Sequence, residues 1–508
     1  MVRPRLVAVV DELGMKKSLP AAAEHFEVGG DLRPDAPVIF LGLGPEPARL
    51  PEWFGLEAST SVSFVESQDV IDQIDNWENA VPDTFGRIPA GDFNAQLAAG
   101  CRIIRYLPTQ KAFPSFFAPL TARTLVRKPS DAARVVWLPV SEDGLLTREL
   151  SLAFEAAGYG VRHIDHEALC QRPGVVLPKL LQEEPPTLFF SVNFKGLDPH
   201  GLGFHILREA GVQVGVWLVD NPFHLLTAVK SGYWRQARLF VTDHSFIGPL
   251  IETGARWAAH LPLAACPELF AEGGELPEHG EDLGDRLVFV GRSEFPKRDK
   301  FFAGLTPDAS LMETARHMLD NGERPHFLWW RERIQAQLWP GNDVRKVGAG
   351  AEASGQAWRT RCLAAAAGHA VIFGDDGWKR MPGVQAEVRS PVDYYAHLPA
   401  LYRKAAATLN VTGMQLPAGL TQRHFDVWCA GGFLITDANP GLKIFPEELT
   451  APVTFETPDG VALLHERFAQ ESPERQELQK KWQGHIESHH TYANRVETVL
   501  ASFGLEGA

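Results

Sequence analysis

The stretch GLTQRHFDVWCAGGFLITDANPGLKIF, residues 419–445, decides the fold of the chain. A short helical pattern runs over about residues 421–430, and Gly431 and Gly432 end it, as glycines past a helix commonly do. The next residues, 433–436, are mostly apolar and predict a strand. Asp437 then stands at the carboxyl end of that strand, where open α/β sheets bind their ligands. The stretch therefore predicts part of a ligand-binding α/β domain.

Three polar side chains of the predicted helix are candidates for ligand binding. Arg423 and Asp426 are three residues apart, so a helix places them on one face. An arginine can grip a phosphate or a carboxylate, and an aspartate can accept hydrogen bonds from sugar hydroxyls. His424 lies between them and is either a further partner of the ligand or a core residue. This chemistry favours a nucleotide-sugar site, with a solvated helix face as the alternative.

The composition is that of a globular protein of several domains. For 508 residues a length prior gives about three domains. Hydrophobic residues make up 45% and charged residues 22%, so disorder is not indicated. The net charge of −14 argues against a general surface for nucleic acid or anionic membrane.

Cysteine usage and hydropathy indicate the compartment. The five cysteines are odd in number, far apart and form no CxxC pair, which favours a reducing compartment over a disulfide framework or a zinc site. Residues 1–17 carry only a short apolar run, so neither a signal peptide nor a spanning helix is expected there. No apolar run of about 18 residues occurs elsewhere. We expect a soluble cytoplasmic protein without an integral membrane segment.

Residues 1–127 predict a separate, Rossmann-like accessory module. A buried strand at 37–41 leads into Gly42-Leu43-Gly44, and a second strand ends in Glu66. A strand, a glycine loop and an acid about twenty residues on outline a nucleotide-binding βαβ half. The third glycine is missing, and Pro45-Glu46-Pro47 stands where a helix start should hold the pyrophosphate. A degenerate module with a packing role is therefore favoured over a site for NAD or S-adenosylmethionine.

Residues 132–275 predict the first of two tandem α/β domains. The segment 113–125 before it is aromatic and proline-bearing and is expected to be irregular, and 128–131 to be a linker. Strands are expected at 134–140, 161–165, 187–192, 212–219, 239–242 and 258–263, with helices at 147–157 and 205–210. Short loops between alternating strands and helices imply parallel pairing.

Two acids follow strands of this domain, and a parallel sheet would direct both into one crevice. They are Asp220 and Asp243. Helix capping is an equal alternative for Asp243. The Asn221-Pro222 that follows Asp220 blocks an immediate helix and leaves its carboxylate available.

Residues 284–485 predict the second α/β domain, after a linker at 270–285 that is rich in Glu and Gly. Strands are expected at 286–290, 370–373, 407–411 and 433–436. Helices are expected at 399–406 and through 310–367, the latter interrupted by Pro340-Gly341 and by the glycine-rich piece 348–355. Charged helices at 473–488 and 491–503 close the chain, with 486–508 as its C-terminal helical segment.

The loop after the first strand of this domain suits a diphosphate. Gly291 allows a close approach, and Arg292 and Lys297 supply two cations, although a surface charge run is the alternative. Gly374 follows another strand and is expected beside the same ligand. The Asp375-Asp376 pair after it is expected to form a turn rather than a metal site.

Several of these segments carry a family resemblance. The pieces are WLVDNPF at 217–223, LFVTD at 239–243, LPLAACPELF at 261–270, FVGRSEFPKRDKFF at 289–302, FGDDGW at 373–378, LNVTGMQLPAGLTQRHFDVWCAGGFLITD at 409–437 and HHTYANRV at 489–496. From about residue 134 onward the chain resembles the CgeB-like (spore maturation protein type) glycosyltransferases, relatives of glycosyltransferase family 4. The resemblance implies the GT-B fold, in which two Rossmann-like domains face a cleft. It implies that residues 132–275 bind the acceptor, that 284–485 bind the nucleotide-sugar donor, and that no metal is required. The N-terminal module lies outside this pattern and faintly resembles degenerate methyltransferase-like modules that precede some protein-glycosylating enzymes.

The resemblance also implies residue roles. Arg292 and Lys297 match the family's diphosphate-binding cations and are expected to stabilise the leaving group. Asp426 matches the second acid of the EX7E motif, which binds the donor ribose, and Asp220 matches the acid that faces the cleft. The first acid of the motif falls at Ala418, where no carboxylate is present.

Two functions follow from these observations. The first is transfer of a sugar, with retention expected, from a nucleotide diphosphate sugar, a UDP-sugar above all, to a glycan or protein hydroxyl. No other cofactor is expected, and if the enzyme inverts, Asp220 is the candidate base. The second is a catalytically inactive GT-B protein that binds a glycan or a partner, which Ala418 favours.

Overall fold

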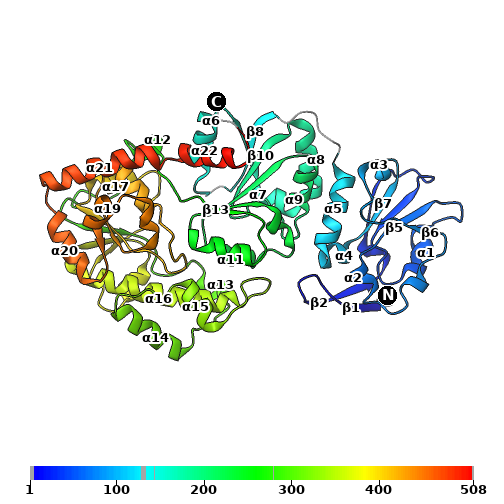
Figure 1. The fold of residues 1–508 in the computed structure, drawn as a ribbon, viewed down its shortest axis with the longest axis horizontal. Helices are drawn as coiled ribbons and strands as arrows, with labels where there is room; N and C mark the ends of the chain where they lie inside the picture. Colours follow the sequence, from blue (N-terminus) through cyan, green and yellow to red (C-terminus); the bar gives the residue numbers. More distant parts are fainter. Residues whose placement is uncertain (1–4, 127–132, 142–143, 279, 506–508) are drawn as a thin grey trace.

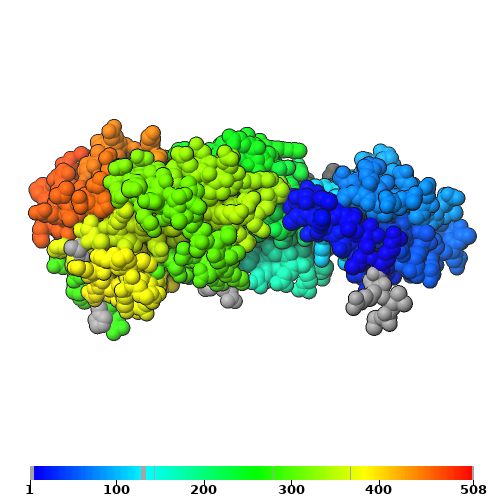
Figure 2. Space-filling view, turned by 90° about the horizontal axis from the view of Figure 1, so that it is seen from below, coloured from blue at the N-terminus to red at the C-terminus, as the bar shows by residue number. Residues whose placement is uncertain are grey.

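The computed structural model describes residues 5–126, 133–141, 144–278 and 280–505. Figure 1 shows three α/β parts in chain order along the long axis, with the N-terminal module at one end. The space-filling view in Figure 2 shows the same elongated order of the three parts. The linker predicted at 128–131 lies outside the described residues.

The N-terminal module contains a hairpin and a five-stranded sheet. The hairpin is β1 (Arg5–Val10) and β2 (Lys16–Ala21), and the sheet order is β3-β7-β4-β5-β6. The sheet strands are β3 (Phe26–Gly30), β4 (Val38–Leu41), β5 (Val62–Val65), β6 (Phe85–Arg87) and β7 (Arg102–Tyr106). The helices are α1 (Leu50–Phe54), α2 (Gln68–Ile71), α3 (Ala95–Ala98), α4 (Leu107–Ala112) and α5 (Pro114–Leu125). Only β3 runs antiparallel to its neighbour in the sheet, so the Rossmann-like pattern is present in part.

The prediction of an irregular segment at 113–125 is wrong, because helix α5 covers it. Pro114 stands at the first helical position, where its missing N–H costs nothing. Pro119 lies inside the helix and is tolerated, while Phe117 and Leu120 are buried and supply packing energy. Burial therefore outweighs the local signal that proline gives.

The first α/β domain has a six-stranded, fully parallel sheet of order β13-β12-β11-β10-β8-β9. Its strands are β8 (Ala133–Val140), β9 (Gly160–Asp165), β10 (Pro186–Val192), β11 (Gln213–Leu218), β12 (Arg238–Val241) and β13 (Ala258–His260). Its helices are α6 (Thr147–Ala156), α7 (His166–Gln171), α8 (Pro173–Glu183), α9 (Leu202–Glu209), α10 (Pro222–Leu226), α11 (Ile247–Glu252) and α12 (Pro267–Phe270). These bounds confirm the predicted strands to within a few residues.

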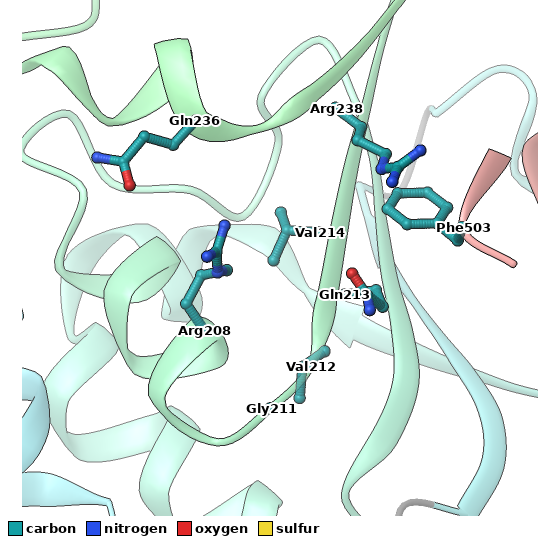
Figure 3. A pocket seen from close by; sticks show the side chains of 8 residues that line it. All are labelled: Arg208, Gly211, Val212, Gln213, Val214, Gln236, Arg238 and Phe503. Atoms are coloured by element: carbon teal, nitrogen blue, oxygen red, sulfur yellow. The ribbon is translucent and has the colours of Figure 1, made fainter. Parts of the chain in front are cut away.

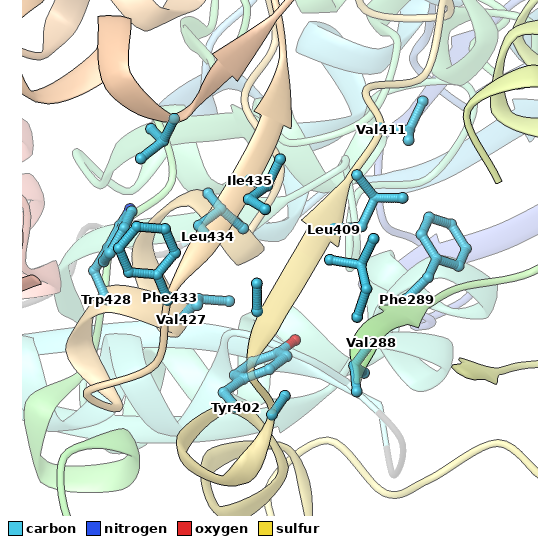
Figure 4. Packing of buried hydrophobic residues seen from close by; sticks show 14 of the residues in the cluster. Val288, Phe289, Tyr402, Leu409, Val411, Val427, Trp428, Phe433, Leu434 and Ile435 are labelled. Carbon is cyan, nitrogen blue, oxygen red and sulfur yellow. The ribbon is translucent and has the colours of Figure 1, made fainter. Parts of the chain in front are cut away.

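The second α/β domain repeats the design, with strand order β16-β15-β14-β17-β18-β19, all parallel. Its strands are β14 (Leu287–Val290), β15 (Ala370–Phe373), β16 (Glu387–Arg389), β17 (Ala407–Asn410), β18 (Leu434–Asp437) and β19 (Thr454–Phe455). Its helices are α13 (Arg298–Phe301), α14 (Ala309–Asp320), α15 (Phe327–Ile334), α16 (Val344–Ala365), α17 (Leu398–Lys404), α18 (Arg423–Cys429), α19 (Glu447–Thr450), α20 (Asp459–Phe468), α21 (Pro473–His489) and α22 (Tyr492–Ser502). Figure 4 shows the packing of β14, β17 and β18 against Tyr402, Trp428 and Phe433. The two parallel sheets confirm the predicted GT-B class.

The glycine-rich piece 348–355 does not interrupt the helical region, because α16 runs through it without a break. Glycine is needed there for space. A Cβ on Gly350 would lie 2.3 Å from the Trp330 ring, and one on Gly348 would lie 2.4 Å from His224 Nε2. The glycines thus let α16 approach α15 and α10 closely.

Two helices join the domains. The first half of α16 packs in the core of the first domain through Val344 and Val347, and its second half packs in the second core through Trp358 and Leu363. Helix α22 leaves the second domain and packs beside α6, as Figure 1 shows. No helix in the described ranges combines the length and apolar character needed to cross a membrane.

Candidate functional site

The loop after β14 lies at the carboxyl edge of the second sheet, next to the centre of the strand order. A Cβ on Gly374 would lie 2.3 Å from the Gly291 carbonyl oxygen, so two loops meet there too closely for side chains. Asp375 accepts hydrogen bonds from the backbone N–H (2.9 Å) and the hydroxyl (2.6 Å) of Ser293. Asp375 also caps the turn at Gly377, which confirms the predicted role of the acid pair as a turn.

The two predicted diphosphate-binding cations lie on this loop and are exposed. Arg292 and Lys297 form no ion pair with any described residue. Lys297 has a positive φ of 52°, a strained conformation for a residue with a side chain, and such strain is common at functional sites. The loop thus presents two cationic side chains to solvent at the edge where ligands bind in parallel sheets.

Helix α16 supports this loop from behind. Glu352 is buried and accepts hydrogen bonds from Phe295 N–H (3.1 Å) and Arg359 Nη2 (3.0 Å). Gln356 donates to the Ser293 carbonyl oxygen at 3.3 Å. These residues were not predicted, because the glycine-rich piece 348–355 indicated a break in the helix that carries them. Their spacing of four and seven residues along one helix face was the signal that could have identified them.

Arg423 is held inside the domain rather than presented to solvent. Its Nη1 donates to the Val290 carbonyl oxygen at 2.7 Å and its Nε donates to Asn410 Oδ1 at 2.9 Å. Burial lowers the pKa of its guanidinium. These contacts place Arg423 beneath the strand end that leads into Gly291, where it positions the loop.

Asp426 and His424 are both buried, with 1% of their surface exposed. Asp426 accepts hydrogen bonds from the Tyr394 hydroxyl at 2.6 Å and from Gln422 Nε2 at 2.9 Å, and burial raises its pKa to about 8. His424 Nε2 lies 3.1 Å from the Thr436 hydroxyl, and burial lowers its pKa to about 3. In this structure both side chains therefore make internal contacts, and Tyr394 covers the acid expected to bind ribose.

Asp437 does not face the crevice, contrary to the expectation from its place at a strand end. It is fully buried and accepts hydrogen bonds from Thr412 N–H and hydroxyl, each at 2.9 Å, and from Trp358 Nε1 at 2.9 Å. It ties the β17 and β18 strand ends to α16.

The two acids of the first domain have different surroundings. Asp220 is exposed as a residue and accepts a hydrogen bond from Asn193 Nδ2 at 2.7 Å. Desolvation of its carboxyl group by the surrounding protein raises its pKa. Asp243 is buried; its Oδ1 caps Ser245 and its Oδ2 accepts the Ala418 N–H of the second domain at 2.9 Å. Capping is thus one of two roles of Asp243, whereas Asp220 stands at an exposed position.

Four contacts bring the two domains together at their carboxyl edges. Asn221 Nδ2 donates to the Gln415 carbonyl oxygen at 2.8 Å, beside the Asp243 to Ala418 bond. The Tyr395 hydroxyl donates to the buried Glu149 carboxylate at 3.0 Å. Gln422 donates to the Ala264 carbonyl oxygen. Asp220 and Arg292 therefore belong to facing domains that are held together, while Tyr394 and Tyr395, which the sequence analysis missed, lie at their junction.

Two cavities lie at the carboxyl edge of the second sheet. One of about 420 Å³ is lined by Phe373 and residues 388–393, at the ends of β15 and β16. The other, of about 450 Å³, lies between α14 and α15 and the loops after β17 and β18. A third cavity, of about 300 Å³, lies in the first α/β domain, at the amino ends of β11 and β12 (Figure 3). There Arg238 is occupied by the Ser502 carbonyl and the Phe503 ring, so this cavity is remote from the cationic loop.

The glycine loop of the N-terminal module is filled by its own side chains. A Cβ on Gly42 would lie 2.7 Å from the Thr109 hydroxyl, and one on Gly44 would lie 3.3 Å from the Phe26 and Tyr106 rings. Glu66 is buried and accepts hydrogen bonds from Leu43 N–H at 2.8 Å and from Ser67 N–H at 3.1 Å. This packing favours the structural role over a nucleotide site.

Comparison with known proteins places residues 353–501 in a match to a family described as glycosyl transferase-like. A UDP-forming alpha,alpha-trehalose-phosphate synthase from Burkholderia xenovorans is similar in structure, with 12% identity, a TM-score of 0.40, and coverage of 73% of this chain and 99% of that one. Anabaena HepE in complex with UDP-glucose is similar with 10% identity, a TM-score of 0.43, and coverage of 73% and 99%. No curated protein matches the chain in sequence. The family match runs from α16 to α22, and the two facing parallel sheets have the two-domain GT-B architecture.

Proposed function

We propose that the chain transfers a sugar from a nucleotide diphosphate sugar, a UDP-sugar in the first place, to a hydroxyl of a glycan or a protein. The observation that carries this proposal is the exposed pair Arg292 and Lys297. They lie on a loop whose backbone, at Gly291, closely approaches the loop that contains Gly374. A diphosphate at this loop would meet two cations and a backbone free of side chains. The proposed donor domain is 284–485, the acceptor domain is 132–275, and the reaction takes place in the cytoplasm.

The same two cations would also help the nucleotide diphosphate to leave. The nucleotide diphosphate leaves with added negative charge, and preorganised cations stabilise that charge in the transition state. Arg292 and Lys297 would supply this stabilisation, and no metal ion or other cofactor is required in the proposal. Activity that survives chelation with EDTA is the expected result.

The proposed reaction retains configuration, as in glycosyltransferase family 4, to which the CgeB-like enzymes that the sequence resembles are related. Retention requires no strong base on the acceptor. The exposed Asp220 is next to Asn221, which binds Gln415 of the second domain, and would orient the acceptor hydroxyl through hydrogen bonding. If products show inversion, the raised pKa of Asp220 suits it to the role of general base.

A second candidate function, a catalytically inactive glycan-binding or partner-binding protein, is favoured by two observations. Position 418 carries alanine where the family motif has an acid. Asp426, the proposed ribose contact, is covered by Tyr394, so donor binding requires Tyr394 to move. Stabilisation by UDP without turnover on any acceptor would select this candidate.

Thermal-shift titration with UDP, GDP and TDP tests donor binding, since a ligand specific to the folded state raises the midpoint. UDP should raise the midpoint of the wild-type protein, and Arg292→Ala should abolish the shift. Arg316→Ala, which removes an exposed arginine in α14, is the matched control and should keep it. Equal shifts in both variants would refute the site assignment. Release of UDP from UDP-sugars then separates the active from the inactive candidate.

A further inference from the structure

The cavity of about 450 Å³ between α15 and the loops after β17 and β18 has the composition of a carbohydrate site. Its volume lies within the range of about 300–1,000 Å³ that small-ligand pockets span. Trp329 is only half-buried and supplies an aromatic face in the wall. Met414, Leu416 and Pro417 continue the apolar surface on the loop side. An apolar wall with a flat ring suits the C–H face of a sugar.

Polar groups at the same wall supply both kinds of hydrogen bond. His326 Nδ1 accepts the Trp329 backbone N–H at 3.3 Å, so the neutral ring carries its proton on Nε2. Burial lowers the pKa of His326 and favours this neutral form. Glu332, one turn further along α15, is exposed and offers carboxylate oxygens to hydroxyls. A donor and an acceptor therefore flank the aromatic face.

The charges around the cavity select against a phosphate. Glu323 and Glu332 are acidic. The two terminal nitrogens of Arg324 are in use, because they donate to the Gly322 and Glu456 carbonyl oxygens, and its Cζ lies 3.4 Å from the centroid of the Trp358 ring. Its Nε is enclosed, without a hydrogen-bond partner among the described residues. A neutral, hydroxyl-rich ligand fits these groups, whereas a nucleotide diphosphate would meet two carboxylates.

The cavity lies beside the junction of the two domains. The loop 412–417 supplies most of one wall and leads directly into Ala418, whose N–H donates to Asp243 of the first domain. Gln415 of this loop accepts a hydrogen bond from Asn221, next to Asp220. Helix α15, which supplies the other wall, contacts the first domain through Arg331, which pairs with Glu252 of α11 at 3.7 Å. Figure 1 shows α15 near α11.

We propose that this cavity binds a neutral saccharide unit of the acceptor, held on the donor domain by Trp329, His326 and Glu332. The proposal deepens the proposed function and rests on it for the identity of the ligand as acceptor. The binding itself requires no donor and can be measured alone. It extends the acceptor site beyond the first domain, across the junction marked by Asp243 and Ala418.

Saturation-transfer NMR on the full chain tests the proposal, with N-acetylglucosamine, methyl glucoside and maltose as the probes and glycerol as a small polyol control. At least one saccharide should receive transfer from the wild-type protein, and glycerol should not. Trp329→Ala should reduce the affinity at least about tenfold, because the aromatic face is lost. Trp53→Ala, a half-buried tryptophan of the N-terminal module, is the matched control and should bind as the wild type does.

Glu332→Gln guards against misfolding of the Trp329 variant, since Glu332 is exposed and its replacement is close in volume. It should weaken binding about tenfold, as expected for loss of a charged hydrogen-bond acceptor. Absence of transfer to all three saccharides, or equal transfer in the wild type and both cavity variants, would overturn the proposal. Arg292→Ala should leave saccharide binding intact, so failure of this site is distinguishable from failure of the donor site.

Discussion

Arg292 and Arg423 lie at the same end of β14 in opposite surroundings. Arg423 is enclosed and donates to the Val290 carbonyl and to Asn410, whereas Arg292 is exposed and makes no ion pair with any described residue. Arg423 holds the end of β14, and Arg292 is available to a ligand. A loss of donor binding in an Arg423 variant would therefore not show direct contact with the donor.

Stability measurements separate these two roles. Arg423→Ala leaves two acceptors, the side chain of the buried Asn410 and the carbonyl oxygen of the half-buried Val290, without their donor and should lower the free energy of unfolding by about 3 kcal/mol. Arg292→Ala should change it by less than about 0.5 kcal/mol, as exposed substitutions usually do. Urea unfolding of both variants measures the difference. Equal losses would contradict the division of roles.

Glu66 should make the N-terminal module pH-dependent. Burial raises its pKa from 4.5 to about 7. Between these values the folded state holds a proton that the unfolded state has released, so stability is full below about pH 4.5 and falls as the pH rises to about 7. The shift corresponds to roughly 3 kcal/mol. Above about pH 7 the contribution stays constant.

Hydrogen exchange of the β4 amides, corrected for intrinsic rates, measures this effect in the full chain. Wild-type protection should fall between pH 5 and pH 7, and Glu66→Gln, which cannot titrate, should lack that fall. A parallel pH dependence in both proteins would rule out Glu66 as its source.

At the scale of single elements, α16 is the part that joins the two cores, and its glycines make this possible. Gly350→Ala gains helix propensity of about 1 kcal/mol but forces a methyl group against the Trp330 ring. Overpacking costs about 1–3 kcal/mol, so a net loss of stability is expected. Gly355→Ala meets only ordinary contacts, the nearest at 3.4 Å, and should stabilise by up to about 1 kcal/mol. Thermal unfolding of the pair that showed the same sign for both would contradict this account.

The same helix shows how far the sequence could predict the structure. The buried strands and their parallel order were predictable, because short apolar runs such as 287–290, bounded by turn signals, are typical of the buried strands of a parallel sheet. The unbroken course of α16 was not predictable, since glycines in a sequence usually indicate a break in a helix. Here glycine is required because Trp330 of α15 and His224 of the first domain pack against the helix, and the local sequence does not show these contacts. Helix α5 was not predicted for a similar reason, because its prolines indicate an irregular segment, whereas burial of its apolar side chains stabilises the helix.

The candidate site was predictable in part for a similar reason. Position after a strand correctly placed Arg292, Lys297 and Asp220 on exposed loops at the carboxyl edges of the sheets. It could not distinguish these from Asp437, which also ends a strand but is enclosed by Thr412 and Trp358. Whether a polar residue faces solvent or core depends on side chains from distant segments, and the pattern of one segment does not contain that information.

Among the contacts that join the two α/β domains, the hydrogen bond from Tyr395 to the buried Glu149 can be removed by a single conservative substitution. Tyr395→Phe leaves a buried carboxylate without this donor and should cost about 1–3 kcal/mol. Tyr233→Phe is the matched control, because the buried Tyr233 hydroxyl has no hydrogen-bond partner among the described residues. Chemical unfolding should show a loss only for Tyr395→Phe. A loss of the same size in both would mean that the contact does not stabilise the junction.

The proposed function depends on binding of the nucleotide-sugar diphosphate by the loop 291–297. A crystal structure of the protein soaked with UDP tests it most directly. The diphosphate should lie within hydrogen-bond distance of Arg292 and Lys297, with the backbone of Gly291 beside it, and the ribose should displace Tyr394 from Asp426. UDP bound elsewhere, for example at the glycine loop of the N-terminal module, with Arg292 and Lys297 free of contact, would contradict it.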